Sequence, residues 1–412
     1  MFRALGERNY RLFFAGQVLS NSGTWMQRVA QDWLVLDLSG SSGTALGITT
    51  GLQFLPYLLL SLWGGKLADK FDRRRLLMIT QALMGLLALV LGLTTLHGSA
   101  TVYLVYAFAF ALGLVSAVDN PTRQAFVHEI VDHKSLHNAI SLNSASFNLA
   151  RLLGPAIAGL MVAAIGSGWV FLVNAVSFGV TIGALMLMRR RELREQVREE
   201  GDVRLMDGFR FVRTRPDLVL VVVIIAGVAA FGLNFQITMA LIARQEFGLG
   251  AAQFGFMSTS LAVGAICGSL MAARRHRATL RAVVVSGIAF GIVTLVIGLS
   301  PNYEFMLVML PLAGGLAMTF TTSTQSFMQI RSEPWVRGRI MGIFTLMLFG
   351  GTPFCAALIG VSADMFGARS GLVGGGIGSI VWTVIAVMIY LRHRARTRPD
   401  EPAWRASFTR GR

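Results

Sequence analysis

The strongest constraint on this sequence is a short charged stretch between two apolar runs, each long enough to cross a membrane. Residues 64–77 contain seven charged side chains, whereas residues 44–63 and 76–96 contain none. A helix needs roughly 20 apolar residues to cross a hydrocarbon core about 30 Å thick. The pattern therefore predicts two membrane-spanning helices joined by a tight turn at the membrane surface.

The composition extends this prediction to the whole chain. The sequence is 54% hydrophobic and 14% charged, with a mean hydropathy of +0.61, whereas soluble domains carry roughly 25% charged residues. The short alternating strands of a membrane β-barrel do not occur. We therefore expect an all-α polytopic membrane protein. Its twelve spans are expected at about residues 10–36, 45–64, 76–96, 101–121, 138–164, 169–188, 218–242, 252–272, 282–299, 304–327, 338–361 and 371–391.

Basic residues are distributed unevenly between the two sides of these spans. If the N-terminus is cytoplasmic, all but four of the 37 Lys and Arg residues fall on the cytoplasmic side. The exceptions are Arg244 and Arg369 on the opposite side, and Arg28 and Arg151 within spans. This asymmetry predicts a multi-pass protein of the cell membrane with both termini in the cytoplasm. It also assigns the net charge of +16 to contact with anionic lipid, and not to nucleic acid.

The longest charged connection divides the chain into two halves of six spans. Residues 123–126 read Arg-Gln-Ala-Phe and residues 324–327 read Thr-Gln-Ser-Phe, a weak echo of one half in the other. This echo predicts two pseudo-symmetric six-helix bundles related as parallel repeats. The expected parts are a bundle at 1–188, a cytoplasmic loop at 189–217 with a short amphipathic helix at 204–213, a bundle at 218–391 and a basic tail at 392–412.

Span 1 carries polar residues along one helical face. Gln17, Asn21, Arg28 and Asp32 recur at helical spacing, with Trp25 between them. Ionisable residues within a span are costly, so they are functional candidates by default. One interpretation is a substrate cavity in which Asp32 takes up and releases a proton. The alternative is a structural ion pair of Arg28 with Asp32 that holds helices together.

Other spans add polar residues to the candidate cavity. In span 5, Arg151 has no local acid, so it either contacts substrate or pairs elsewhere, for example with Asp119 at a cytoplasmic gate. The uncharged polar groups of spans 7 and 10 suit a cavity that accepts varied substrates, although helix–helix hydrogen bonding explains them as well. The further cavity candidates are Asn148, Asn234, Gln236, Thr322 and Gln325.

The charged stretch resembles the signature that major facilitator superfamily transporters carry between spans 2 and 3. The matching residues are Gly65, Leu67, Ala68, Asp69, Arg73, Arg74 and Leu77, while Lys70 and Asp72 depart from the pattern. The resemblance implies two bundles that rock about a central cavity in alternating access. It also implies a cytoplasmic latch in which Asp69 and Arg73 act against span 11 and the end of span 4.

A second stretch is similar to the drug and siderophore exporter branch of that superfamily, which includes enterobactin exporters. It comprises residues 119–126, 136–139 and 151–155. This similarity implies export of small organic molecules, with protons as the coupling ion and a monomeric protein. With the first stretch it places the cytoplasmic gate at Gly65, Asp69, Arg73, Arg74, Asp119, Arg123, Gly154 and Pro155.

Several other functions are not expected. Hydrolase and phosphate-loop motifs are missing from the sequence, so neither an enzyme nor a bound cofactor is predicted. His128, His133 and His137 do not have the spacing of a known metal site, so no metal is predicted. The alternatives to proton-coupled export are uptake or uniport, metal-ion export by the same fold, and a membrane sensor that does not transport.

Overall fold

The structure is a computed structural model that describes residues 3–194, 205–273, 279–333 and 336–397. Within these residues the chain is helical apart from short connections, and it contains no strand. It divides into two compact units, Met1–Glu200 with Gly248–Thr259, and Gly201–Phe247 with Ser260–Arg412. The helices of the described residues confirm the expected all-α class.

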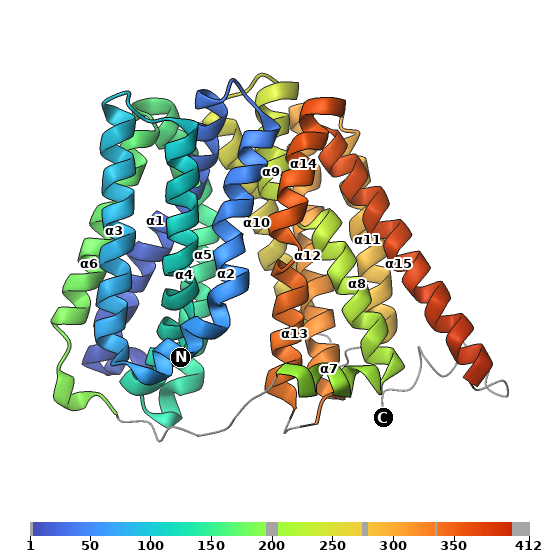
Figure 1. The fold of residues 1–412 in the computed structure, drawn as a ribbon, viewed down its shortest axis with the longest axis horizontal. Coiled ribbons are helices and arrows are strands. Elements are labelled where there is room, and N and C mark those ends of the chain that lie inside the picture. Colours follow the sequence, from blue (N-terminus) through green and yellow to red (C-terminus); the bar gives the residue numbers. More distant parts are fainter. Residues whose placement is uncertain (1–2, 195–204, 274–278, 334–335, 398–412) are drawn as a thin grey trace. The chain divides into compact units, whose positions relative to one another are not determined.

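The first unit contains six long helices, which Figure 1 shows in blue to green. Short 3-10 turns lie at Arg3–Gly6 and Arg190–Glu192. The helices are α1 (Arg8–Leu38), α2 (Gly43–Lys70), α3 (Arg73–Leu96), α4 (Val102–Ile130), α5 (His133–Ile165) and α6 (Ser167–Met186).

Local sequence explains where these helices begin. Ser42, Asp72 and Thr101 each stand one residue before a helix, and each side chain accepts a hydrogen bond from a backbone amide of the first turn. Gly166 precedes α6 with a φ of 87°, a left-handed conformation that favours glycine. Asp72 departs from the family signature, and capping α3 gives it a structural role.

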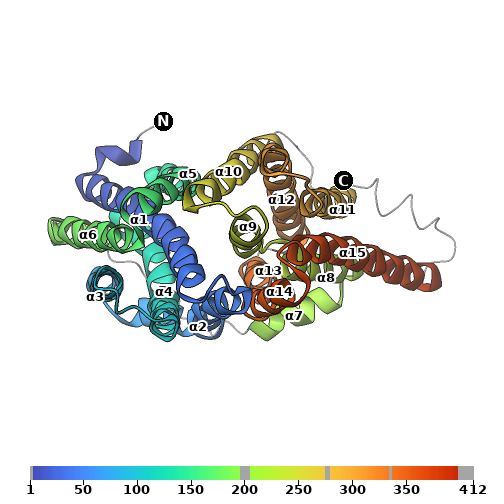
Figure 2. The ribbon, with the colours of Figure 1, turned by 90° about the horizontal axis from the view of Figure 1, so that it is seen from above.

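Within the first unit, α1 packs against α5 and α6, α3 packs against α6, and α2 packs against α4; Figure 2 shows the helices end-on. A buried cluster that includes Tyr10, Phe13 and Phe126 ties α1 to α4 and α5. The rings of Phe13 and Phe126 meet edge to face with centroids 5.7 Å apart. This contact fixes the end of α4 that carries Arg123.

Glycines set the close approach of α2 to α4. A Cβ atom on Gly64 would lie 2.0 Å from the carbonyl oxygen of Ala117, and one on Gly113 would lie 2.3 Å from that of Gln53. Neither position has room for a larger residue. By contrast, a Cβ atom on Gly65 would have nothing within 4 Å.

The second unit repeats this pattern with more breaks. Its glycines again allow close helix approach, since a Cβ atom on Gly264 would lie 1.8 Å from the carbonyl oxygen of Pro311. Its helices are α7 (Leu205–Arg213), α8 (Pro216–Gly232), α9 (Phe235–Leu241) with a π-helical turn at Ile242–Glu246, α10 (Ala251–Ala273), α11 (Leu280–Gly298), α12 (Tyr303–Arg331), α13 (Arg337–Phe349), α14 (Thr352–Phe366) and α15 (Ser370–Thr397). The first part of α10, up to Thr259, belongs to the first unit.

Two expected spans are interrupted. The span expected at 218–242 breaks between α8 and α9, where the side chain of Asn234 donates to the carbonyl oxygen of Ala230 at 2.8 Å. The span expected at 338–361 breaks at Gly350 and Gly351, just before Pro353. Proline lacks the amide hydrogen that a continuous helix requires, and glycine weakens helices.

Eleven helical segments of the described residues are long and apolar enough to cross a membrane. The sequence predicts twelve spans, and the difference is α1, which is long but carries the polar face of Gln17, Asn21, Arg28 and Asp32. The predicted amphipathic helix is present as α7, although Arg204 lies outside the described residues. In α7, Val212 is buried and Asp207 pairs with Arg339 of α13 at 3.5 Å.

Candidate functional site

A network of buried polar side chains in the first unit surrounds Asp119, in the second half of α4. The side chain of Asp119 is 1% exposed. Its Oδ1 atom accepts hydrogen bonds from Thr80 Oγ1 at 2.7 Å and Gln81 Nε2 at 2.8 Å, both on α3. Its Oδ2 atom accepts from Nε of Arg123 at 3.0 Å, and Nη2 of Arg123 also contacts it. The carboxylate is therefore buried but fully hydrogen-bonded, as a buried charge requires.

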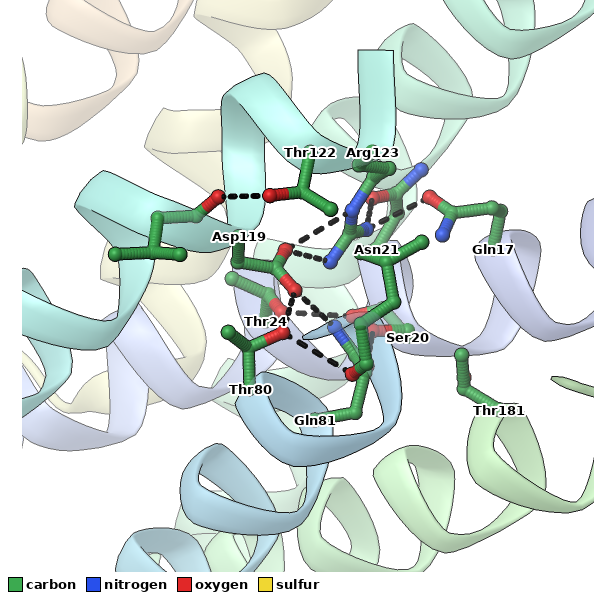
Figure 3. A network of polar contacts seen from close by, with 12 residues as sticks. Gln17, Ser20, Asn21, Thr24, Thr80, Gln81, Asp119, Thr122, Arg123 and Thr181 are labelled. Atoms are coloured by element: carbon green, nitrogen blue, oxygen red, sulfur yellow. Dashed lines mark hydrogen bonds and ion pairs between the residues drawn. The ribbon is translucent and has the colours of Figure 1, made fainter. Parts of the chain in front are cut away.

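Arg123 extends this network to α1. Its Nη1 atom donates to Gln17 Oε1 at 2.7 Å and lies 3.5 Å from Asn21 Oδ1. Figure 3 shows α1, α3 and α4 meeting at this one ion pair. Arg123 also lies within helix α4, which continues to Ile130, beyond the span end expected at residue 121. The network thus joins two residues predicted for the gate to two predicted for the cavity.

The charged turn between α2 and α3 forms a second network at the exposed end of the unit. Arg73 donates to Asp69 at 3.0 Å, to Glu129 at the end of α4 at 2.9 Å and to the carbonyl oxygen of Ala68 at 3.0 Å. Asp69 is 70% exposed, whereas Glu129 is 20% exposed. The predicted contact of Arg73 with the end of span 4 is therefore formed, through Glu129.

Arg74 contacts the backbone of α6, whereas Arg73 pairs with carboxylates. It donates to the carbonyl oxygens of Leu185 and Met186, at 2.8 and 3.0 Å. These carbonyls belong to the last turn of α6, where backbone acceptors have no partner within the helix. Arg74 therefore caps α6. Beyond the end of that helix, Nη2 of Arg190 forms an ion pair with Oδ2 of Asp72 at 2.9 Å.

A third cluster lies where α1 packs against α2 and α5. The guanidinium carbon of Arg28 lies 4.9 Å from the ring centroid of Trp25 and 5.7 Å from that of Phe54 on α2. Trp25 also meets Phe147 of α5 edge to face at 5.7 Å. Asp32 is buried one turn beyond Arg28 and interacts with it electrostatically.

Glycine and proline shape the neighbouring part of α5. A Cβ atom on Gly154 would lie 2.8 Å from Cβ of Trp25, so this predicted gate residue packs within the third cluster. The next residue, Pro155, lies inside the continuous helix and lacks the amide hydrogen that would bond the carbonyl oxygen of Arg151. The side chain of Asn148 is half-buried and donates to the carbonyl oxygen of Ser144 at 2.8 Å.

The proposed alternative pairing of Arg151 with Asp119 is not formed, because Arg123 occupies that carboxylate. Among the described residues, Arg151 makes no hydrogen bond or ion pair. It is half-buried on the face of α5 between Phe147 and Gly154. Arg151 therefore lies on α5, which packs against α1, the helix that carries Arg28.

The cavity candidates of the second unit differ in exposure. Asn234 is buried at the break between α8 and α9, and Gln236 is half-buried in α9. On α12, Thr322 is half-buried and Gln325 is exposed. Among the described residues, no hydrogen bond joins these four side chains to one another, in contrast to the network around Asp119.

Sequence reasoning missed Thr80, Gln81 and Glu129 as partners of the charged residues. Thr80 and Gln81 are adjacent polar residues inside an otherwise apolar run, and that interruption was the available signal. Glu129 lies in the histidine-containing segment that was considered for metal binding. No group of three described His, Cys, Asp or Glu side chains converges as a metal site requires.

Comparison with known proteins identifies the family of this chain and several relatives. Residues 1–406 match the family described as transmembrane secretion effector, MFS_3. The chain is 26% identical over 385 residues to the staphyloferrin A transporter of Staphylococcus aureus (strain NCTC 8325 / PS 47), covering 92% of this chain and 96% of the relative. It is 24% identical over 369 residues to the enterobactin exporter EntS of Escherichia coli (strain K12), covering 88% and 86%.

Solved structures show the same fold at low identity. A POT family transporter in complex with a thioalcohol-conjugated peptide gives a TM-score of 0.75 at 11% identity, covering 93% of this chain and 96% of that one. A bacterial homologue of the human lysosomal transporter Spinster gives 0.71 at 15%, covering 97% and 99%. At such identities the likeness concerns the fold alone.

The family match over residues 1–406 and the whole-length relatives identify a multi-pass membrane transporter of the major facilitator type. Its helical units carry ionisable residues inside membrane-spanning segments, where transporters keep their functional groups. Within that class, the chain belongs to the transmembrane secretion effector family.

Proposed function

We propose that this protein is a secondary active exporter of small, siderophore-like organic molecules, working by alternating access in the cell membrane. The observation that carries the proposal is the whole-length similarity to the secretion effector family and to relatives named for siderophore transport and export. The ion gradient is proposed as the energy source, with protons as the coupling ion. We further propose a monomer whose cytoplasmic loops contact anionic lipid.

The contacts of the first unit support different roles for its charged residues. The network of Asp69, Arg73 and Glu129 is proposed as the cytoplasmic latch, since it ties the α2–α3 turn to α4 by exchangeable ion pairs. Asp119 and Arg123 are proposed to link that latch to α1. Asp32 is proposed as the proton carrier, because a buried acid near a cation responds to competition for its charge.

Transport into inside-out vesicles tests this function. Vesicles from expressing cells, energised to be acidic inside, are expected to accumulate a siderophore or an apolar drug, and nigericin is expected to abolish the accumulation. Persistence of accumulation without a proton gradient would overturn proton coupling. Accumulation only in right-side-out vesicles would reassign the protein to uptake.

The proton role of Asp32 has its own test in the same vesicles. Asp32→Asn is expected to stop gradient-driven accumulation while leaving exchange of labelled for unlabelled substrate intact, since exchange needs no net proton movement. Gradient-driven accumulation at the wild-type rate would remove Asp32 from that role.

A further inference from the structure

Helix α7 is held against the second unit by one of its faces. Figure 1 shows it lying across the ends of α8 and α13, the helices that it contacts. Val212 is 5% exposed, and a Cβ atom on Gly208 would lie 2.9 Å from Cβ of Arg339 on α13. Asp207 pairs with the same arginine at 3.5 Å. The face of α7 that carries Gly208 and Val212 is therefore covered by the protein itself.

The opposite face of α7 is exposed and carries positive charge. Met206, Arg210 and Arg213 follow one another at spacings of four and three residues, so they lie on one side of the helix. All three are exposed, and the exposed fraction of Met206 is 68%. A long apolar side chain beside two arginines suits the boundary between lipid headgroups and acyl chains.

The two arginines of this face have no acidic partner of their own. The acidic residues of α7 and of the start of α8, Asp207 and Asp217, already pair with arginines of α13 and α12, at 3.5 and 3.8 Å. Among the described residues, Arg210 and Arg213 make no hydrogen bond or ion pair. The exposed face of α7 is therefore complementary in charge to an anionic surface.

The end of the second unit that carries α7 is also its basic end. Within the described residues of this unit, exposed arginines lie at the end of α12 and at the starts of α11 and α13, on the side where α8 begins. Arg244 and Arg369 lie toward the other end. This asymmetry predicts that α7 lies at the cytoplasmic surface of the membrane, where anionic lipid is found.

We propose that the exposed face of α7, formed by Met206, Arg210 and Arg213, docks on anionic phospholipid of the cytoplasmic leaflet. The arginines bind lipid phosphate groups through their N–H donors, and Met206 contacts the acyl chains next to the headgroups. The contacts with α13 fix the rotation of α7, so that this face points away from the protein. The assignment rests on the proposed contact of the cytoplasmic loops with anionic lipid, and it assigns that contact to one helix face.

Quenching of a fluorophore at residue 206 by labelled lipids tests the assignment. The full-length protein carries Met206→Cys as its one cysteine, with Cys267→Ser and Cys355→Ser, and is labelled with a nitrobenzoxadiazole maleimide in nanodiscs of mixed phosphatidylcholine and phosphatidylglycerol. A nitroxide near the headgroup end of an acyl chain is carried by one lipid or by the other, at the same fraction. We expect phosphatidylglycerol to bind beside the probe roughly fivefold or more tightly than phosphatidylcholine, since each arginine near an anionic surface contributes about that factor.

The double variant Arg210→Gln with Arg213→Gln is expected to bring the relative affinity of the two lipids to about one. Arg281→Gln is the matched control, because Arg281 is an exposed arginine at the start of α11; its relative affinity is expected to remain that of the parent protein. Melting temperatures show that each variant is folded. Replacing chloride by inorganic phosphate at constant ionic strength is expected to leave the preference for phosphatidylglycerol unchanged.

Four outcomes would overturn the proposal. Quenching by neither lipid would show that this face of α7 points into water, as docking of an acidic protein requires. Equal quenching by both lipids would remove the preference for an anion, and a preference that survives the double variant would remove the two arginines from it. Loss of the preference in inorganic phosphate would assign the arginines to a free anion.

Failure of this assignment is separable from failure of the proposed function, because quenching requires no transport. Gradient-driven accumulation in vesicles, without a lipid preference at residue 206, would keep export and reject the lipid-binding face. A lipid preference that depends on both arginines, without accumulation in vesicles, would keep the lipid-binding face and reject export.

Discussion

At the scale of single residues, Asp119 carries the largest predicted effect on stability. Asp119→Asn removes the anion that satisfies Arg123, Thr80 and Gln81, and leaves a largely buried cation without its partner. Breaking a buried ion pair costs about 3–5 kcal/mol. Thermal unfolding in detergent is expected to show a large loss of stability, and transport is expected to be lost with it.

Asp69→Asn is the control for this prediction. Asp69 is also paired with an arginine one turn away, but it is 70% exposed, and such surface pairs are worth about 0–1 kcal/mol. Its melting temperature is expected to remain close to that of wild type. Equal destabilisation by the two substitutions would contradict the burial argument. The double variant Asp119→Asn with Arg123→Gln should recover part of the loss, since it removes the unpaired cation.

The identity of the charged residues followed from the sequence, but their pairing did not. Asp119 and Arg123 were predicted for the gate, and Gln17 and Asn21 for the cavity, from motif similarity and helical spacing. Their connection depends on how α4 is rotated about its axis, which glycine contacts with α2 and the packing of Phe126 determine. These are long-range contacts that periodicity within one helix does not encode.

At the scale of helices, two adjacent glycines are expected to behave differently. Gly64→Ala places a methyl group 2.0 Å from the carbonyl oxygen of Ala117, whereas Gly65→Ala places it in open space. Overpacking costs roughly 1–3 kcal/mol, and replacing a helical glycine by alanine gains up to about 1 kcal/mol. Melting temperatures should therefore fall for the first variant and hold or rise for the second. The reverse order would contradict the described approach of α2 to α4.

The cap that Arg74 provides for α6 gives a second prediction at this scale. Arg74→Gln removes the donors to Leu185 and Met186, so the last turn of α6 is expected to open more often. Hydrogen exchange by mass spectrometry should show faster exchange in peptides covering that turn. Arg75→Gln is the control, since Arg75 is the exposed neighbour on α3. Unchanged exchange in Arg74→Gln would remove the capping role.

The interrupted helices were less accessible to sequence reasoning than the continuous ones. Hydropathy finds segments of spanning length, and the mean hydropathy of each of these two segments stays high across its break. The warning signs were Asn234 in one segment and Gly350, Gly351 and Pro353 in the other. Because Pro155 lies inside a continuous helix while Pro353 begins one, proline alone does not decide whether a span breaks.

At the scale of the whole molecule, the two units repeat one plan. Thr101 and Asn302 cap α4 and α12, two helices of 29 residues each. Gly166 and Gly367 have φ angles of 87° and 89° just before α6 and α15. These features recur about 200 residues apart, as parallel repeats require. The charged turn that would match residues 64–77 in the second half includes residues 274–278, which lie outside the described residues.

The crossing of α1 decides whether the chain has the predicted twelve spans and two cytoplasmic termini. Its 31 residues span about 46 Å at 1.5 Å per residue, more than the roughly 30 Å hydrocarbon core.

In a background of Cys267→Ser and Cys355→Ser, Leu38→Cys should react with a membrane-impermeant maleimide in intact cells. Arg3→Cys should react only after permeabilisation, and Ser99→Cys in the α3–α4 connection should react in intact cells as an external reference. Reaction of both Arg3→Cys and Leu38→Cys in intact cells would show that α1 does not cross, and would reduce the count to the eleven spans that hydropathy alone supports.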